Sequence, residues 1–115
     1  MTRPDCIFCR IAAGAIPADV VGEDDGFVAF RDIAPKAPVH LLVIPRRHVP
    51  SIAGVDGLEE GERAAMLPFI ARVARDAGLD GGGYRVTTNH GPDARQSVHH
   101  LHWHVMGGAP LSETM

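Results

Sequence analysis

The most regular pattern in the chain is an alternation of histidines and apolar residues within residues 97–105. Three histidines and three apolar residues take turns there: His100, Leu101, His102, Trp103, His104 and Val105. Strict alternation predicts a β-strand with two unlike faces. Three imidazoles on one face indicate a functional site, because each buried histidine needs a polar partner.

Apolar spacing predicts the other elements as well. A helical turn is expected at 9–13, a hairpin at 20–21 and 27–30, a buried central strand at 39–44, and a strand at 84–88. Met66, Ile70 and Val73 fall at helical spacing and predict a long helix over 57–77, which Pro68 should kink or restart. The order of elements predicts an α+β fold, an antiparallel sheet of about five strands with the long helix packed on it.

Composition narrows the class of protein. The chain has 115 residues, of which 45% are hydrophobic, and this predicts one folded domain over 1–115. The formal net charge is −3 and the cationic residues are scattered, which argues against a nucleic-acid polymer or an anionic membrane as partner. No apolar run is long enough to span a bilayer and no signal peptide is evident, so a cytoplasmic location is expected.

A second cluster of chemistry lies near the N-terminus, where Cys6 and Cys9 are separated by two residues. This spacing favours a metal site over a redox pair, since no strand precedes Cys6. Zinc takes four Cys or His ligands, and His48 is a candidate third. The residues alone leave His99 and His100 as candidates for the fourth. The alternative is a pair of reduced, metal-free cysteines that pack as small apolar side chains.

The histidine row itself has two functional interpretations. In one, His100, His102 and His104 chelate a single catalytic metal, as in a metallohydrolase. In the other, one imidazole is a nucleophile and its neighbours tune it. A structural role for all three is the weaker interpretation.

Several segments together resemble the histidine triad (HIT) nucleotide-binding proteins. Residues 96–108, QSVHHLHWHVMGG, are similar to that family's His-x-His-x-His signature, and the closing Gly-Gly looks more like the Hint branch than the diadenosine polyphosphate hydrolases. Four further features fit the same family: DCIFC at 5–9, as in its zinc-bearing bacterial members, FRDIAP at 30–35, HLLVIPRRH at 40–48, and the positions of Asn89, Gly91 and Ser97.

The resemblance implies hydrolysis of nucleoside 5′-phosphoramidates to nucleoside monophosphates through a covalent nucleotidyl-histidine. His102 would attack the α-phosphorus, with its tautomer held by a backbone carbonyl. His104 would bind the phosphate oxygens, and Ser97 would help to protonate the leaving amine. The expected nucleotide-binding set is Phe30, Asp32, Ile33, Leu42, Asn89, Ser97, Val98 and His104.

The resemblance also implies that His100 completes a structural zinc site with Cys6, Cys9 and His48. It places His40 beside the triad. It further implies a homodimer that joins the Met66–Ala77 helix and an edge strand into a continuous sheet.

Some positions keep alternatives open. Asp32 either accepts from the ribose hydroxyls or caps a turn before Pro35. Arg95 replaces a small glycine of the Hint branch, and His99 replaces a usual aromatic. The chain stops at Met115, short of the tail seen in some relatives. A non-catalytic nucleotide-binding module and a diadenosine polyphosphate hydrolase are the alternative functions.

Overall fold

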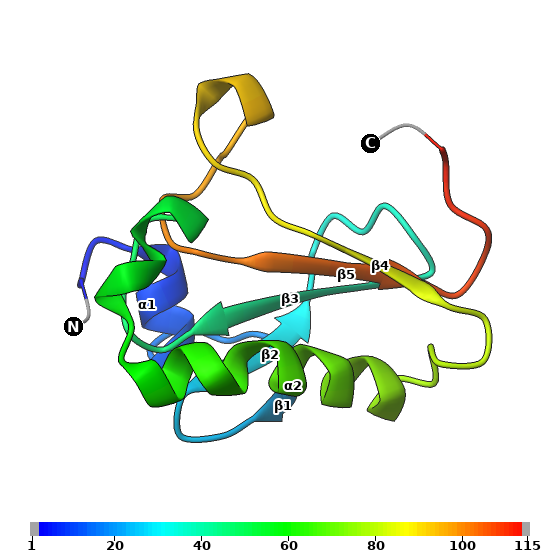
Figure 1. Ribbon diagram of the computed structural model, residues 1–115, viewed down its shortest axis with the longest axis horizontal. Helices are drawn as coiled ribbons and strands as arrows, with labels where there is room; N and C mark the ends of the chain where they lie inside the picture. Colours follow the sequence, from blue (N-terminus) through cyan, green and yellow to red (C-terminus); the bar gives the residue numbers. More distant parts are fainter. Residues whose placement is uncertain (1–2, 114–115) are drawn as a thin grey trace.

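The computed structural model describes residues 3–113 and consists of five strands, two α-helices and two short 3₁₀ helices (Figure 1). The strands are β1 (Val20–Glu23), β2 (Phe27–Arg31), β3 (Val39–Pro45), β4 (Tyr84–Thr87) and β5 (Trp103–Gly107). The helices are α1 (Ile7–Ala12), η1 (Ile52–Gly57), α2 (Glu60–Asp76) and η2 (Pro92–Ala94). The predicted α+β class is therefore confirmed.

All five strands form one antiparallel sheet in the order β1-β2-β3-β5-β4. The predicted hairpin is β1–β2, in which the Asp24 carboxylate accepts from the backbone N–H groups of Gly26 and Phe27 at 2.9 Å each. The apolar run at 39–44 becomes β3, the central strand, as predicted, because only a strand covered on both faces can be apolar throughout.

Different groups of side chains pack on the two faces of the sheet. On the helix face, Phe27, Leu41 and Val105 pack against Phe69 and neighbouring side chains of α2 to form the larger apolar core. α2 crosses in front of the sheet in Figure 1.

The opposite face is the histidine face. Phe30 and Leu42 pack there with Phe8 of α1 in a smaller apolar cluster. His104 pairs with Leu42 across the β3–β5 ladder, and directly opposed side chains share a face. His40 lies two residues before Leu42 on β3 and so points to the same side.

The long helix differs from its prediction in both its start and its continuity. It begins at Glu60, where Glu59 and Glu62 form a capping box, whereas Gly57, the predicted start, is the last residue of η1. It runs through Pro68 without a restart. Pro68 is exposed, and Phe69 and Ile70 next to it are buried against the sheet, so packing outweighs the one backbone hydrogen bond that proline cannot make.

The histidine strand is also shorter than predicted. β5 begins at Trp103, so His104 lies on the strand but His100 and His102 precede it. The Leu101 N–H donates instead to the Val49 carbonyl at 2.8 Å. The partner strand β3 ends at Pro45, which has no N–H to offer a longer ladder.

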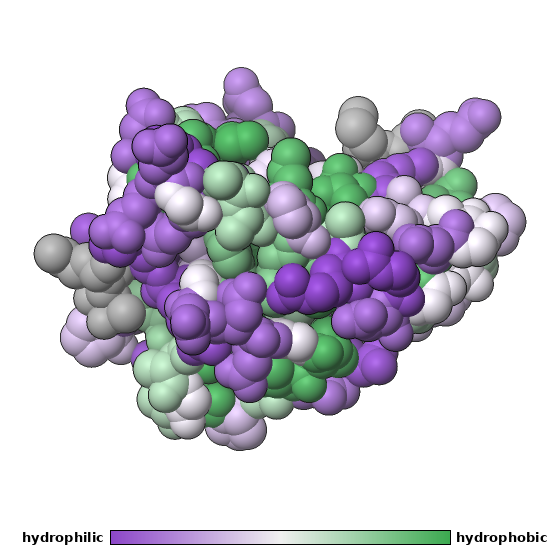
Figure 2. Space-filling model, turned by 60° about the horizontal axis from the view of Figure 1, so that its bottom comes forward, coloured by the Kyte–Doolittle hydropathy of each residue, from purple (hydrophilic) through white to green (hydrophobic). Residues whose placement is uncertain are grey.

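The exposed apolar side chains of residues 3–113, such as Ile33, Val20 and Leu67, come from several segments of the chain. Figure 2 shows apolar groups on one side separated by polar ones. Over residues 3–113, no helix combines the length and apolar character needed to cross a bilayer.

Candidate active site and metal cluster

His102 is held in one tautomer by the backbone beside it. Its Nδ1 lies 2.8 Å from the carbonyl oxygen of His100, and a carbonyl only accepts, so Nδ1 carries the proton. Nε2 then has a free lone pair. Among residues 3–113, the indole nitrogen of Trp103 is the only fully enclosed side-chain nitrogen or oxygen without a hydrogen-bond partner. The Nε2 of His102 also has no partner, so it must be accessible to solvent, although the residue as a whole is only 6% exposed. An accessible imidazole lone pair is the form that acts as a nucleophile.

The backbone around His102 is fixed by a residue that sequence reasoning missed. The Thr88 hydroxyl, just after β4, donates to the His102 carbonyl at 2.6 Å. The Phe8 ring packs edge-on against the His102 ring with centroids 5.1 Å apart, and against His100 at 5.9 Å. Hydrogen bonds therefore hold the backbone at His102, and Phe8 of α1 packs against its ring.

The structure brings Cys6, Cys9, His48 and His100 together, with their ligand atoms all within 4.8 Å of one another. The Nδ1 of His100 lies 3.3 Å from the Cys6 sulfur and 3.5 Å from the Cys9 sulfur, and the Nδ1 of His48 lies 3.3 Å from the Cys9 sulfur. Tetrahedral zinc with ordinary bond lengths places sulfur and nitrogen ligands roughly 3.5 Å apart. The four residues therefore fit zinc in both chemistry and spacing.

The outer side of His100 supports the same conclusion. Its Nε2 donates to the Pro45 carbonyl at 2.8 Å, which leaves Nδ1 unprotonated and directed at the thiols. Burial lowers the pKa of His100 to about 4, so the ring is neutral at pH 7. Burial also raises the pKa of the Cys9 thiol, a penalty that a bound cation would offset. His99, the competing fourth ligand, is exposed and lies outside this cluster.

A second cluster joins Asp32, His40 and His104. The Nε2 of His40 lies 2.9 Å from the Nδ1 of His104 and 3.4 Å from a carboxylate oxygen of Asp32. The other Asp32 oxygen accepts from the Ala34 N–H at 2.8 Å, so the turn-cap interpretation of Asp32 is confirmed for that oxygen. Burial lowers the pKa of His40, and burial together with the nearby His102 lowers the pKa of His104 to about 4.

The loop from Asn89 to Val98 is organised by Gln96, whose role the sequence did not predict. The Gln96 side chain accepts from the Gly91 N–H at 3.0 Å and donates to the carbonyls of Pro50 at 2.7 Å and Val98 at 3.1 Å. Ser97 is exposed, and its hydroxyl has no hydrogen-bond partner in residues 3–113. The loop is therefore braced at Gln96 while the adjacent hydroxyl is available to a ligand.

Three further loop residues have distinct surroundings. Arg95 has a φ of 59°, in the left-handed region that favours the glycine it replaces. His90, unassigned from the sequence, lies on the exposed loop but its Nδ1 is 2.7 Å from the hydroxyl of the buried Ser51. Asn89 is half-buried.

The predicted base-binding residues fall into two groups. Phe30 and Leu42 are buried on the histidine face, and Val98 is half-buried against them. Ile33 is fully exposed on the loop after β2. A base held by all of them would therefore lie between a fixed apolar floor and a side chain free to adjust.

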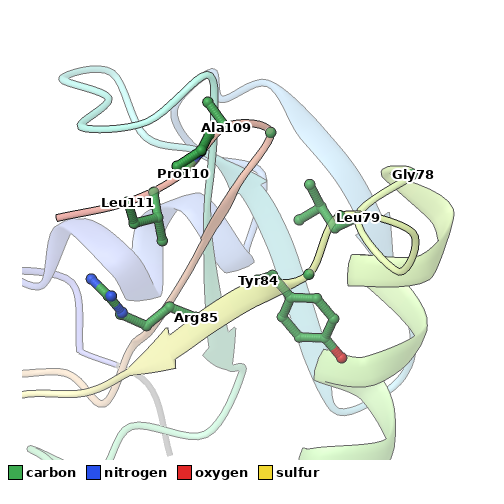
Figure 3. A pocket seen from close by; sticks show the side chains of 10 residues that line it. Gly78, Leu79, Tyr84, Arg85, Ala109, Pro110 and Leu111 are labelled. Atoms are coloured by element: carbon green, nitrogen blue, oxygen red, sulfur yellow. The ribbon is translucent and has the colours of Figure 1, made fainter. Parts of the chain in front are cut away.

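A cavity lies elsewhere, at the β4 edge of the sheet. Its volume is about 800 Å³, and its lining includes Leu79, Tyr84, Arg85 and Leu111 (Figure 3). None of the histidines lines it. Its position at the outer edge of the sheet fits an interaction surface better than the histidine chemistry.

An antiparallel sheet with a helix on one face, and with histidines and a Cys₂His₂ cluster on the other, defines a small α+β protein with a histidine-based site. The HIT domain matches residues 13–111, and the chain belongs to the HIT family.

Known relatives agree with this membership. The chain is 38% identical to the purine nucleoside phosphoramidase of Escherichia coli K12, over 93% of this chain and 90% of that protein. A histidine triad protein from Clostridium difficile is similar over the whole of both chains, with a TM-score of 0.93 and 41% identity. A HIT family hydrolase from Legionella pneumophila matches with a TM-score of 0.89 and 41% identity, over 96% of this chain and 98% of that one.

Proposed function

We propose that this protein is a nucleoside phosphoramidase-like hydrolase that works through a covalent nucleotidyl-histidine at His102. The observation that carries the proposal is the His100 carbonyl 2.8 Å from the His102 Nδ1, which leaves the solvent-open Nε2 as a lone-pair donor. Membership of the HIT family and the phosphoramidase name of the Escherichia coli relative support the reaction class.

The reaction splits one displacement at phosphorus into two. The Nε2 of His102 forms a bond to the α-phosphorus while the phosphorus–nitrogen bond to the amine breaks. The amine leaves with that electron pair and takes up a proton, for which the Ser97 hydroxyl is the proposed donor. Water then attacks phosphorus and gives up one proton, which returns to the Ser97 oxygen. The bond to His102 breaks, and the nucleoside monophosphate leaves with His102 restored to its neutral form.

The other proposed roles follow from the positions of the side chains. His104, next to His102 on the histidine face, would donate to the phosphate oxygens as charge gathers on them. Asn89 and the backbone around Ser97 and Val98 would hold the same group. The Asp32 oxygen that does not cap the turn would accept from the ribose. The base would lie against Phe30, Leu42 and Ile33.

Zinc is the proposed occupant of the Cys6, Cys9, His48 and His100 cluster. With four protein ligands the site is closed, so its metal would supply structural restraint and no open position for substrate. The restraint reaches the nucleophile through one residue, because His100 is both a ligand and the source of the carbonyl that holds His102.

The protein is also proposed to be a homodimer. β4 is an edge strand, and the exposed Tyr84 and the cavity beside Leu79 lie along it, next to the C-terminal end of α2. An unpaired strand edge beside an open cavity that is lined in part by apolar side chains is a surface that a second copy would cover. Light scattering should give twice the mass of one chain.

The decisive experiment is to trap the intermediate. The protein is mixed with an adenosine 5′-phosphoramidate, quenched under denaturing, non-acidic conditions, and examined by intact mass spectrometry for one added adenylyl group that acid removes. His102→Ala should form no adduct and should lower kcat by about 10⁴-fold or more. His99→Ala, an exposed neighbour outside the site, is the matched control and should keep the adduct. Turnover by His102→Ala at the wild-type rate would overturn the assignment, and binding without turnover in wild type would favour a non-catalytic nucleotide module.

A further inference from the structure

The Asp32, His40 and His104 cluster has two possible uses, and its backbone contacts distinguish them. Its three ligand atoms lie within 4.8 Å of one another, and two histidines with one carboxylate are a set that transition metals accept. The alternative is a chain of hydrogen bonds. The position of the protons on His40 decides between the two.

The backbone fixes the tautomer of His40. The Lys36 N–H donates to the His40 Nδ1 at 3.0 Å, and a backbone amide nitrogen cannot accept in return. Nδ1 of His40 is therefore unprotonated. Burial lowers the pKa of His40, so the ring is neutral, and its single proton lies on Nε2.

This tautomer disfavours a metal at the cluster. A neutral imidazole that binds a metal through Nε2 must carry its proton on Nδ1, where it normally donates to an acceptor. In this structure the Lys36 N–H occupies that direction, so two hydrogens would face each other. The His40 Nε2 is a donor here, and its nearest acceptor is the His104 Nδ1 at 2.9 Å, ahead of Asp32 at 3.4 Å.

The proton on His40 in turn sets the tautomer of His104. Because the His104 Nδ1 accepts, the neutral ring carries its own proton on Nε2. Within residues 3–113 that Nε2 has no hydrogen-bond partner, and it is not enclosed. The His102 and His104 rings lie next to each other, with centroids 5.2 Å apart. One ring therefore offers an outward lone pair and its neighbour an outward N–H.

We propose that His40 is a positioning residue that fixes His104 as an Nε2–H donor toward the transferring phosphoryl group, with the Lys36 backbone N–H as the anchor of the chain. The inference rests on the proposed function for the identity of the acceptor. The tautomers themselves do not depend on it. In the other tautomer, His104 would present a lone pair to phosphate oxygens and repel them.

The first test is a measurement on the wild-type protein. Long-range proton–nitrogen NMR of ¹⁵N-labelled protein separates protonated from unprotonated ring nitrogens. His40 and His104 should both be Nε2–H tautomers, and His102 should be an Nδ1–H tautomer. A His104 ring protonated on Nδ1 would overturn the proposal, whether or not the protein hydrolyses phosphoramidates.

Two variants of similar size then test the link between the rings. His40→Gln keeps a donor near the position of Nε2, and His40→Asn keeps an acceptor for Lys36 but no donor toward His104. His40→Asn should mix the two tautomers of His104 and lower kcat about tenfold, the equivalent of one hydrogen bond, with KM little changed. His40→Gln should restore the Nε2–H tautomer and most of kcat. If both variants lost kcat equally and the His104 tautomer were unchanged, His40 would have only a packing role.

The outcomes separate the two proposals. If the protein has the expected tautomers but hydrolyses no phosphoramidate, the proposed function is wrong and the inferred chain of hydrogen bonds is still supported. Metal analysis supplies the last check: wild type should bind one zinc, and Asp32→Asn should bind one as well. A second zinc that Asp32→Asn removes would show that the cluster is a metal site and overturn the inference.

Discussion

The two clusters on either side of His102 are built from similar side chains, yet their protons lie in opposite places. In the Cys/His cluster, the outer nitrogen of His100 faces the carbonyl of Pro45 and must carry a proton. Its inner nitrogen, Nδ1, is therefore unprotonated, and the lone pair on it is directed at the two thiols. In the Asp/His cluster, the outer nitrogen of His40, Nδ1, faces the N–H of Lys36 and must be unprotonated. Its inner nitrogen, Nε2, therefore carries the proton and is a donor.

The difference teaches that spacing alone does not define a metal site. Both clusters bring their ligand atoms within 4.8 Å of one another. A single backbone group behind each imidazole, an acceptor in one case and a donor in the other, decides whether the ring can bind a cation. The comparison also explains how one short segment could supply the proposed ligand, nucleophile and phosphate donor without interference.

The largest expected effect comes from breaking the Cys/His cluster. Cys9→Ala removes a proposed zinc ligand that is 2% exposed, and a structural zinc contributes directly to folding. The bound zinc should fall from one per chain to near zero. The free energy of unfolding should drop by on the order of 3 kcal/mol or more, measured by urea denaturation alongside metal analysis.

Asp32→Asn is the matched control, since it alters the other cluster at a side chain of similar size. It should leave zinc content unchanged and shift the unfolding midpoint little. If Cys9→Ala kept its zinc and its midpoint, the cysteines would be the metal-free apolar pair that the sequence left open.

Periodicity and residue type predicted the sheet and its central strand, and they gave Cys6, Cys9 and His48 as candidate metal ligands. The resemblance to the HIT family supplied His100 as the fourth ligand and Asp32 and His40 as site residues. Alternation placed His100 and His102 on a strand that begins only at Trp103. Their rings nevertheless lie on the histidine face, because both pack against Phe8 and the His102 ring lies next to that of His104.

Other features depend on backbone groups that have no signature in the sequence. The carbonyl of Pro45 and the N–H of Lys36 set the tautomers, and any residue type could supply the carbonyl. Gln96 stood inside the quoted motif, but one of its three side-chain hydrogen bonds reaches Pro50, 46 residues away in the chain, while the other two are local. The continuity of α2 through Pro68 reflects tertiary packing that outweighs local propensity.

A smaller effect is expected at Phe8, the ring that α1 packs against both His100 and His102. Phe8→Leu should cost about 1.5 kcal/mol of stability through lost ring contacts. It should also weaken zinc binding and lower kcat/KM several-fold, because it loosens the segment that the two sites share. Phe69→Leu, which is also buried but on the helix face, is the control and should lower stability with no change in zinc or kcat/KM. Equal activity losses in the two variants would mean that the faces are not independent.

The smallest expected effect is a pH dependence of stability that comes from His104, in the Asp/His cluster. Burial, with His102, His40 and Lys36, disfavours charge on His104 and lowers its pKa to about 4, while Asp32 opposes this weakly. Between pH 6.5 and 4, His104 therefore binds a proton in the unfolded chain but stays neutral in the folded protein. The free energy of unfolding falls as pH falls across this window. From pH 7 to pH 5 the loss due to His104 should be roughly 1 kcal/mol for a partly exposed ring.

The comparison of wild type with His104→Asn isolates that loss. Both proteins share the Cys/His cluster, so its own acid sensitivity cancels in the difference between their urea unfolding free energies. Wild type should lose more stability than the variant between pH 7 and pH 5, and the difference should level off below about pH 4 because the folded ring is then protonated as well. A difference that stays constant with pH, or grows toward alkaline pH, would mean that His104 is not held neutral and that the opposite polarity of the two clusters is wrong.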